Sequence, residues 1–174
     1  LLDGLTGSGK TEVYFETIFE TLKQGKQVLV LLPEIYLSFE WLMRFKNSFK
    51  LVPLVWHSNL TKKTRRATWD QIIKGKLNVV VGARSALFLP FRELGLIVID
   101  EEHENSYKQQ EPSPRYHARD SAIVLSRLYK SKIILGSATP SIESSENARN
   151  GKYGWVKLHE RSVSYTHLRA HETG

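Results

Sequence analysis

The sequence predicts an α/β fold in which a mostly parallel sheet carries helices on both faces. Several short runs are almost continuously apolar, as in strands that are buried on both faces of a parallel sheet. Segments with apolar residues every three to four positions, typical of helices, alternate with these runs. A glycine-rich loop at residues 4–11 stands between the first apolar pair and the first helical segment. Strand, glycine loop and helix is the order that a phosphate-binding loop requires.

The glycine-rich loop, Gly4-Leu5-Thr6-Gly7-Ser8-Gly9-Lys10-Thr11, has the spacing of a phosphate-binding loop. Glycines let backbone N–H groups approach phosphate oxygens, and the next helix adds its positive dipole end. We expect Lys10 to reach the β- and γ-phosphates of a nucleotide and Thr11 to offer its hydroxyl to Mg²⁺. A chance glycine-rich turn is the alternative. The predicted nucleotide-binding residues are Gly4, Thr6, Gly7, Ser8, Gly9, Lys10 and Thr11.

A second motif joins an apolar run, residues 94–99, to the acidic stretch Asp100-Glu101-Glu102-His103. A buried strand that ends in carboxylates places Asp100 where it can hold Mg²⁺ and Glu101 where it can polarise an attacking water. We therefore predict Lys10, Asp100 and Glu101 as catalytic residues, with Thr11 and Asp100 as the Mg²⁺ ligands. A solvated acidic turn is the alternative.

Caps and apolar stripes predict the helices. They cover residues 11–24, which Gly25 ends, then 38–49 and 61–73, which Ser38 and Thr61 cap, and finally 117–129. The residues expected to face the core are Phe15, Ile18, Phe19 and Leu22 in the first helix, Phe39, Leu42, Phe45 and Phe49 in the second, Trp69, Ile72 and Ile73 in the third, and Ala118, Ala122, Leu125 and Tyr129 in the last.

Polar residues that follow the predicted strands are further candidates, because ligands bind at the carboxyl ends of parallel strands. The strands are expected at residues 1–2, 27–33, 51–55, 77–81, 94–99, 132–135 and 153–158. Pro33-Glu34-Ile35 lies just beyond one strand end. Arg84 and Ser85 follow another strand and can bind a phosphate group. Ser137 and Thr139 follow a third and can relay hydrogen bonds. Ordinary surface turns are the alternative.

Residues 105–116 show no hydrophobic period and are expected to form a polar loop. Tyr107 and Tyr116 with Lys108 and Arg115 make a mixture suited to stacking on bases and pairing with phosphates. Because this loop follows the acids, it can couple contact with DNA to turnover of ATP. A surface insertion without function is the alternative.

The composition limits the classes of protein. A chain of 174 residues with 41% hydrophobic content suits one globular domain, and no run approaches the length of a membrane span. We expect a cytoplasmic protein without a signal peptide. A net charge of +7 favours an anionic partner such as nucleic acid, although the basic run at residues 62–66 also suits a solvated helix face. The absence of cysteine excludes disulfides and thiolate metal sites within the chain.

Taken together, the motifs closely resemble the bacterial primosomal replication-restart helicases, a family of superfamily 2. The matching segments are residues 4–11, 32–35, 82–91, 100–103, 107–120 and 136–140. The most specific is Tyr107-Lys108-Gln109-Gln110 with Arg115-Tyr116-His117-Ala118-Arg119-Asp120, because many superfamily 2 helicases share the other motifs. The resemblance implies a RecA-like P-loop NTPase lobe of an ATP-dependent 3′ to 5′ DNA helicase that acts at stalled forks. It also implies forked or single-stranded DNA, primosome proteins and single-strand-binding proteins as partners, no membrane, and a place at the bacterial nucleoid.

By this resemblance Lys10 and Thr11 match the nucleotide and Mg²⁺ residues, Asp100 the metal-holding acid and Glu101 the base that orients water. The residues implied to couple DNA to ATP are Arg84, Ser85, Tyr107, Lys108, Arg115, Tyr116, His117, Arg119, Ser137 and Thr139.

Residues 1–163 are expected to form the first motor lobe, clipped at its N-terminus, and residues 164–174 a non-native tail that lacks any apolar period. The resemblance places a second lobe with an arginine finger, and a cysteine-rich zinc region, outside this sequence. We therefore expect this chain to bind Mg-ATP weakly and hydrolyse little of it, because such fingers contribute about 10³ to 10⁵ in rate. A lobe of another superfamily 2 DNA or RNA translocase and a nucleic-acid-binding module without turnover remain alternatives.

Overall fold

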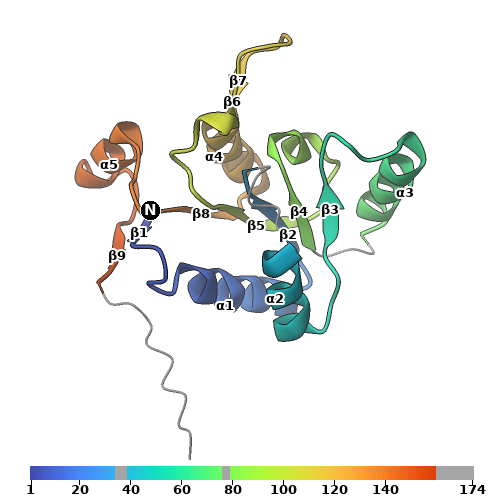
Figure 1. Cartoon of the computed structure of the whole chain (residues 1–174), viewed down its shortest axis with the longest axis horizontal. Helices are drawn as coiled ribbons and strands as arrows, with labels where there is room; N and C mark the ends of the chain where they lie inside the picture. The colour runs from blue at the N-terminus through green and yellow to red at the C-terminus, as the bar shows by residue number, and fades with distance from the viewer. Residues whose placement is uncertain (34–38, 76–78, 160–174) are drawn as a thin grey trace, which may run out of the picture.

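The computed structural model describes residues 1–33, 39–75 and 79–159, and confirms the predicted α/β fold (Figure 1). Within these ranges seven strands form one sheet in the order β3-β4-β2-β5-β8-β1-β9. All of the neighbouring pairs in this sheet are parallel. The strands are β1 (Leu2–Gly4), β2 (Gln27–Leu31), β3 (Leu54–Trp56), β4 (Val79–Gly82), β5 (Leu94–Ile99), β8 (Lys132–Ser137) and β9 (Val156–Leu158). Their carboxyl ends therefore lie along one edge.

Helices cover both faces of the sheet. The helices α1 (Lys10–Lys23) and α2 (Phe39–Phe49) lie together below the central strands in Figure 1. The helices α3 (Lys62–Ile73) and α4 (Ala118–Tyr129) cover the other face with the short 3₁₀ helix η2 (Arg84–Phe88). The helix α5 (Ile142–Arg149) lies beside the edge that ends in β9.

The strand β2 explains why the apolar runs are continuous. Side chains alternate between the faces of a strand, so Val28 and Val30 pack in the cluster under α1 and α2, whereas Leu29 and Leu31 pack in the cluster under α3 and α4. All four are completely buried. A strand with helices on both faces has no solvent side on which a polar residue is favoured.

Two helices are rotated relative to the predicted apolar stripes. In α1 the buried face runs through Tyr14, Ile18 and Thr21, and Phe19 is 50% exposed. In α3 the buried residues are Thr68 and Ile72, while the predicted core residues Trp69 and Ile73 are exposed. Residues three and four apart share a helix face, so burial of one stripe turns the adjacent large side chains towards solvent.

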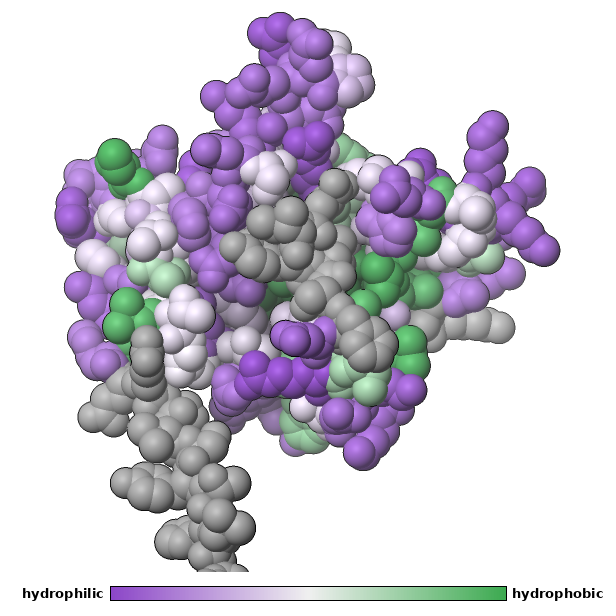
Figure 2. All heavy atoms as spheres, in the orientation of Figure 1, coloured by the Kyte–Doolittle hydropathy of each residue, from purple (hydrophilic) through white to green (hydrophobic). Residues whose placement is uncertain are grey.

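The expectation of an irregular loop at 105–116 is wrong. A 3₁₀ turn, η3 (Asn105–Tyr107), leads into an antiparallel hairpin of β6 (Lys108–Gln109) and β7 (Tyr116–His117), in which Lys108 pairs with His117. The hairpin projects from the body of the protein (Figure 1), and its surface is mostly hydrophilic (Figure 2). Because neither face of this hairpin is buried, its strands lack the alternation of apolar and polar residues by which a strand is recognised in a sequence.

Several expectations concern residues that the structure does not describe. Glu34, Ile35, the cap Ser38, the start of the strand at 77–81 and the tail at 164–174 all lie outside the described ranges. Within those ranges, no helix has the length and apolar character needed to cross a membrane.

Candidate nucleotide site and nucleic-acid surface

A cleft of about 400 Å³ joins the glycine-rich loop to the acidic motif. The loop follows β1 and the acids follow β5, two parallel strands whose carboxyl ends meet at the same edge. The residues that line the cleft are Thr6, Gly7, Gly9, Lys10, Thr11, Glu12, Arg44, Asp100 and Glu101. The structure thus brings together the predicted residues Lys10, Thr11, Asp100 and Glu101, which are about 90 positions apart in the sequence.

The backbone of the loop explains its glycines. Gly7 and Gly9 have φ angles of 80° and 97°, in the left-handed region that glycine tolerates. At Gly4 a Cβ atom would overlap the Ser8 hydroxyl. Gly9 is the N-cap of α1 and offers no side chain to the first helical N–H groups. These donors therefore remain available to an anion at the helix N-terminus.

Two side chains of the loop are polar and buried. Lys10 is 8% exposed, and its ammonium group donates a hydrogen bond of 2.6 Å to the carbonyl of Gly4. The Ser8 hydroxyl is also buried, and it has no hydrogen-bond partner among the described residues. A buried polar group without a partner is unfavourable. An unpaired hydroxyl and a buried cation in one loop suit a phosphate ligand.

The acids occupy an environment that disfavours their charge. Burial raises the pKa of Asp100, while the hydrogen bond donated by the Tyr14 hydroxyl, 2.8 Å long, opposes this shift. Burial, followed by the charge of Asp100, raises the pKa of Glu101. Glu101 has a φ of 47°, and its backbone N–H donates to Asp100 Oδ1. A cation that binds between these carboxylates and the loop relieves their repulsion.

Ser137 and Thr139 lie beside the acids. The Ser137 hydroxyl is completely buried and lies 2.6 Å from Nδ1 of His103. The same His103 nitrogen is 3.6 Å from a carboxylate oxygen of Glu101. Thr139 contributes its backbone N–H, which donates to the Ser137 hydroxyl, while its side chain is exposed. Ser137 is therefore connected to Glu101 through His103.

Sequence reasoning missed Glu102. Its side chain is 0% exposed and accepts hydrogen bonds from Arg119, from the hydroxyls of Ser141 and Ser144, and from the backbone N–H of Ser141. Arg119, implied as a DNA-coupling residue, is 6% exposed and also pairs with Asp120. It is a buried partner of the acidic motif and does not face solvent. The only sign of this residue in the sequence was a third acid, beside the two acids that were assigned roles in Asp100-Glu101-Glu102-His103.

Tyr107 does not have the exposed position that base stacking requires, so this expectation is wrong. Its ring is 1% exposed, and its hydroxyl donates to the carbonyls of Asp100, at 2.6 Å, and Leu31, at 3.1 Å. The aromatic ring fills the core where β2 and β5 end. Tyr107 thus fixes the start of the hairpin to the backbone of the acidic motif.

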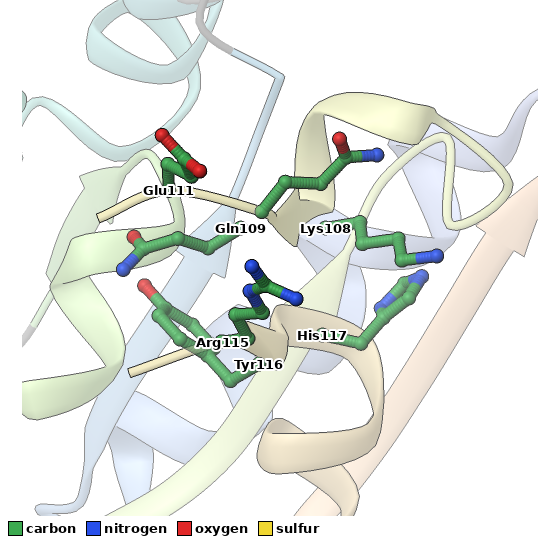
Figure 3. A pocket seen from close by; sticks show the side chains of 7 residues that line it. Lys108, Gln109, Glu111, Arg115, Tyr116 and His117 are labelled. Atoms are coloured by element: carbon green, nitrogen blue, oxygen red, sulfur yellow. The ribbon is translucent and has the colours of Figure 1, made fainter. Parts of the chain in front are cut away.

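The other implied DNA residues gather at the hairpin. A pocket of about 520 Å³ is lined by Lys108, Gln109, Gln110, Glu111, Arg115, Tyr116 and His117. Figure 3 shows that Lys108 and His117, which pair across the hairpin, point to the same side. Lys108 and Arg115 are exposed and Tyr116 is half-buried.

Two residues near the base of the hairpin have mainly structural contacts. Arg84 donates to the carbonyls of Ser106 and Lys108, at 3.0 and 3.3 Å, while its neighbour Ser85 is exposed. His117 caps α4, because its Nδ1 accepts from the backbone N–H of Arg119. Burial, followed by the charge of Arg119, lowers the pKa of His117. Arg84 therefore ties the hairpin to η2, and His117 ties it to α4.

The fold and this cleft define the class of protein: the chain belongs to the DEAD/DEAH box helicase family, which matches residues 1–148. Its curated relatives include proteins named Replication restart protein PriA. The Haemophilus influenzae protein is 53% identical over 169 residues, which cover 97% of this chain and 23% of the relative. The Bacillus subtilis protein is 47% identical over 161 residues, 92% of this chain and 20% of the relative. The predicted resemblance to replication-restart helicases is confirmed.

Solved structures share the fold at lower identity. RecG bound to a three-way DNA junction has a TM-score of 0.63 and 22% identity, over 90% of this chain and 20% of that one. The DUF1998 helicase MrfA bound to DNA has a TM-score of 0.64 and 18% identity, over 92% of this chain and 25% of that one. The chain thus corresponds to about a quarter or less of these proteins and of its curated relatives.

Proposed function

We propose that this chain is the ATP-binding motor lobe of a 3′ to 5′ DNA helicase that acts in replication restart at stalled forks. The observation that carries the proposal is the cleft in which Lys10 and Thr11 face Asp100 and Glu101. The relatives named Replication restart protein PriA support the biological role. Since the chain spans a quarter or less of those relatives, unwinding, fork recognition, and primosome and single-strand-binding partners at the bacterial nucleoid are all part of the proposal.

The residues of the cleft fit a nucleotide triphosphate with Mg²⁺. The backbone of Gly7 and Gly9 and the N-terminus of α1 supply N–H donors to phosphate oxygens. The unpaired hydroxyl of Ser8 lies in the same loop. Lys10 exchanges its hydrogen bond with the Gly4 carbonyl for a phosphate oxygen, which keeps its ammonium group paired when the ligand binds.

Thr11 and Asp100 would hold Mg²⁺, since hydroxyl and carboxylate oxygens are the ligands that this ion prefers. When bound, the ion supplies positive charge that offsets the charge of the phosphates. Glu101 orients the attacking water through its carboxylate. His103, which contacts the Ser137 hydroxyl, lies beside the Glu101 carboxylate and supports its position.

The hairpin supplies the contact with forked or single-stranded DNA. Lys108 and Arg115 pair with phosphates, and Tyr116 offers a partly exposed ring to a base. Ser85 is exposed and offers its hydroxyl to the DNA backbone. Contact at the hairpin reaches the nucleotide cleft through Tyr107, whose hydroxyl binds the Asp100 carbonyl. Arg84 and Arg119 hold the two ends of the hairpin segment in place.

Hydrolysis by this chain alone is expected to be slow. Arg44 is the arginine that lines the described cleft, and it forms an ion pair with Glu12. Transition-state charge in phosphoryl transfer is commonly stabilised by an additional arginine, with an effect of about 10³ to 10⁵ in rate. Substantial DNA-stimulated hydrolysis of ATP by this chain, abolished by Lys10→Ala, would contradict the expectation that hydrolysis needs an additional arginine.

Binding of a fluorescent ATP analogue to the chain, with and without Mg²⁺, tests the proposal. We expect Mg²⁺-dependent binding that Lys10→Ala abolishes and that Lys152→Ala, on an exposed residue away from the cleft, leaves unchanged. The same protein is titrated with single-stranded DNA in the presence and absence of the analogue. A nucleotide-dependent change in DNA affinity supports a motor lobe, whereas DNA binding without any response to nucleotide supports a binding module without turnover.

A further inference from the structure

We propose that Arg44 is a positioning residue of the nucleotide cleft, which holds the carboxylate of Glu12 and offsets its charge so that the phosphates of ATP can bind beside it. Both side chains line the cleft, and they form an ion pair. Glu12 belongs to α1 and Arg44 to α2, the two helices that lie together in Figure 1. This inference rests on the proposed function, because it concerns how the same cleft accepts its nucleotide.

Glu12 places a carboxylate at the anion site of the phosphate loop. Gly9 is the N-cap of α1, so Glu12 occupies the position from which a glutamate commonly reaches back to the N–H of the cap residue. Its Oε2 lies 3.9 Å from the place that a Cβ atom of Gly9 would take. The N–H groups at this end of the helix are also the donors that phosphate oxygens require. The carboxylate and a phosphate therefore compete for one region of positive potential.

The charges that line the cleft show why Glu12 needs a partner. Asp100 and Glu101 are assigned to Mg²⁺ and the attacking water, and Lys10 to the phosphates. Glu12 adds a third negative charge, to which this chemistry gives no role. Apart from Lys10, Arg44 is the cation among the described residues of the cleft. Like charges a few ångströms apart repel each other, so an unpaired Glu12 would disfavour a nucleotide in proportion to the charge of its phosphates.

The aromatic contacts of α2 hold Arg44 in reach of Glu12. The Phe15 ring of α1 meets Trp41, Phe45 and Phe49 edge to face, with ring centres 5.6, 5.7 and 5.4 Å apart. The guanidinium carbon of Arg44 lies 6.0 Å from the centre of the same Phe15 ring. A guanidinium group that is already oriented loses less side-chain entropy in each hydrogen bond that it makes. Packing of α2 on α1 therefore fixes the cation opposite the carboxylate.

The ion pair contributes more to the charge of the cleft than to the stability of the fold. The Arg44 and Glu12 side chains are both more than half exposed. Exposed ion pairs contribute little to stability. The pair uses Oε1 of Glu12, whereas Oε2 is the oxygen near Gly9. Variants of either residue should therefore remain folded, and their effect on nucleotide binding can be measured directly.

The experiment measures the displacement of a fluorescent ATP analogue from the chain by unlabelled ATP, ADP and AMP, each with Mg²⁺. We expect Arg44→Ala to weaken the binding of ATP by about fivefold to fiftyfold, because Glu12 then repels the phosphates. The loss should be smaller for ADP and smallest for AMP, and it should shrink at high salt, which screens the repulsion. Arg44→Lys should retain most of the affinity, since it keeps the positive charge. A purely structural role of Arg44 would weaken all three ligands alike.

Glu12→Gln separates an action through Glu12 from a direct contact between Arg44 and a phosphate. In the Arg44→Ala protein, the added Glu12→Gln should restore most of the affinity for ATP, because it removes the repelling charge. In the wild-type background, Glu12→Gln should bind ATP at least as tightly as the unchanged chain. If Glu12→Gln fails to rescue Arg44→Ala, or by itself weakens the binding of ATP, the positioning role is overturned.

Arg149→Ala is the matched control, since Arg149 forms an exposed ion pair with Glu146 on α5 and does not line the cleft. It should leave the affinities for all three nucleotides unchanged. Circular dichroism verifies that each variant is folded. If the wild-type chain binds ATP and Arg44→Ala binds it equally well, the role of Arg44 is overturned while the proposed function stands. If the wild-type chain binds no ATP analogue, the nucleotide site of the proposed function is overturned, and this inference with it.

Discussion

The hydroxyl of Tyr14 donates a hydrogen bond of 2.8 Å to Oδ1 of Asp100 and so connects the helix of the phosphate loop to the acidic motif. Tyr14 is completely buried, and burial, together with the charge of Asp100, raises the pKa of its hydroxyl. The tyrosine therefore stays a proton donor at any working pH. This bond lowers the pKa of Asp100, against the larger effect of burial.

Tyr14→Phe should raise the pKa of Asp100 further, because it removes a hydrogen bond that stabilises the charged carboxylate. A protonated Asp100 is a poor Mg²⁺ ligand. Affinity for the Mg-bound ATP analogue should therefore fall most at low pH and recover as the pH rises. Titrations between pH 6 and 8.5 measure this. Tyr129→Phe is the control, because it removes a hydrogen bond to the carbonyl of Phe91 far from the cleft. If the affinity of Tyr14→Phe depends on pH in the same way as that of the wild type, the role of Tyr14 is refuted.

Gly136→Ala should destabilise the protein by about 1–3 kcal/mol, the usual cost of overpacking a core. A Cβ atom at Gly136 would overlap the Tyr14 hydroxyl and displace it from Asp100. Chemical denaturation measures the loss. Gly154→Ala is the matched control, because a Cβ at that position meets no atom within 4 Å. Addition of Tyr14→Phe should partly restore the stability of Gly136→Ala, because it removes the hydroxyl that the new Cβ atom meets. If the double variant is no more stable than Gly136→Ala, the Tyr14 hydroxyl is not the source of the destabilisation.

Asp100→Asn should stabilise the ligand-free protein at neutral pH. A carboxyl group whose pKa is raised by folding binds protons more tightly in the folded state, so its contribution to stability falls as pH rises from its ordinary pKa through the raised one. The amide has no such dependence. The advantage of Asp100→Asn should be complete above the raised pKa and vanish as pH falls to the ordinary value. Urea denaturation at pH 4.5, 6 and 7.5 follows this, and a constant difference would show that burial does not perturb Asp100.

Arg119→Met should cost about 3–5 kcal/mol of stability, because it leaves Glu102 charged and completely buried with one partner fewer. The double variant Arg119→Met with Glu102→Gln should recover much of this loss. Arg149→Met is the control, since its pair with Glu146 is exposed and should contribute at most about 1 kcal/mol. Thermal and urea denaturation of the wild type, of the single variants Arg119→Met and Glu102→Gln, and of the double variant give the coupling energy. An additive double variant would show that the two side chains do not interact.

Where the sequence pattern is strong, prediction and structure agree. Thr61 was expected to cap a helix, and its hydroxyl accepts from the backbone N–H of Thr64 at 3.2 Å. The cap and its N–H group are three residues apart, so the signal is local. The parallel sheet was also predicted correctly, because strands buried on both faces must be apolar throughout.

The misassigned residues depend on contacts between distant parts of the chain. Tyr107 looked like a solvent-exposed base-stacking residue, but it is buried because its hydroxyl reaches the carbonyl of Leu31, 76 positions earlier. The resemblance implied that Arg119 couples DNA to ATP, but Arg119 pairs with Glu102 inside the protein. Nothing in the neighbouring residues distinguishes an exposed tyrosine or arginine from a buried one.

Residue type and spacing were enough to predict the phosphate-binding loop, the acidic motif, the α/β class and the resemblance to replication-restart helicases, because each depends on residues close together in the chain. Other features became visible only in the folded chain: the buried face of α1 and α3, the hairpin at residues 108–117, and the support that the acids receive from Tyr14, Glu102, Tyr107 and Arg119. Burial and pairing of polar side chains depend on the elements packed around them, and the strand order brings those elements together from distant parts of the sequence.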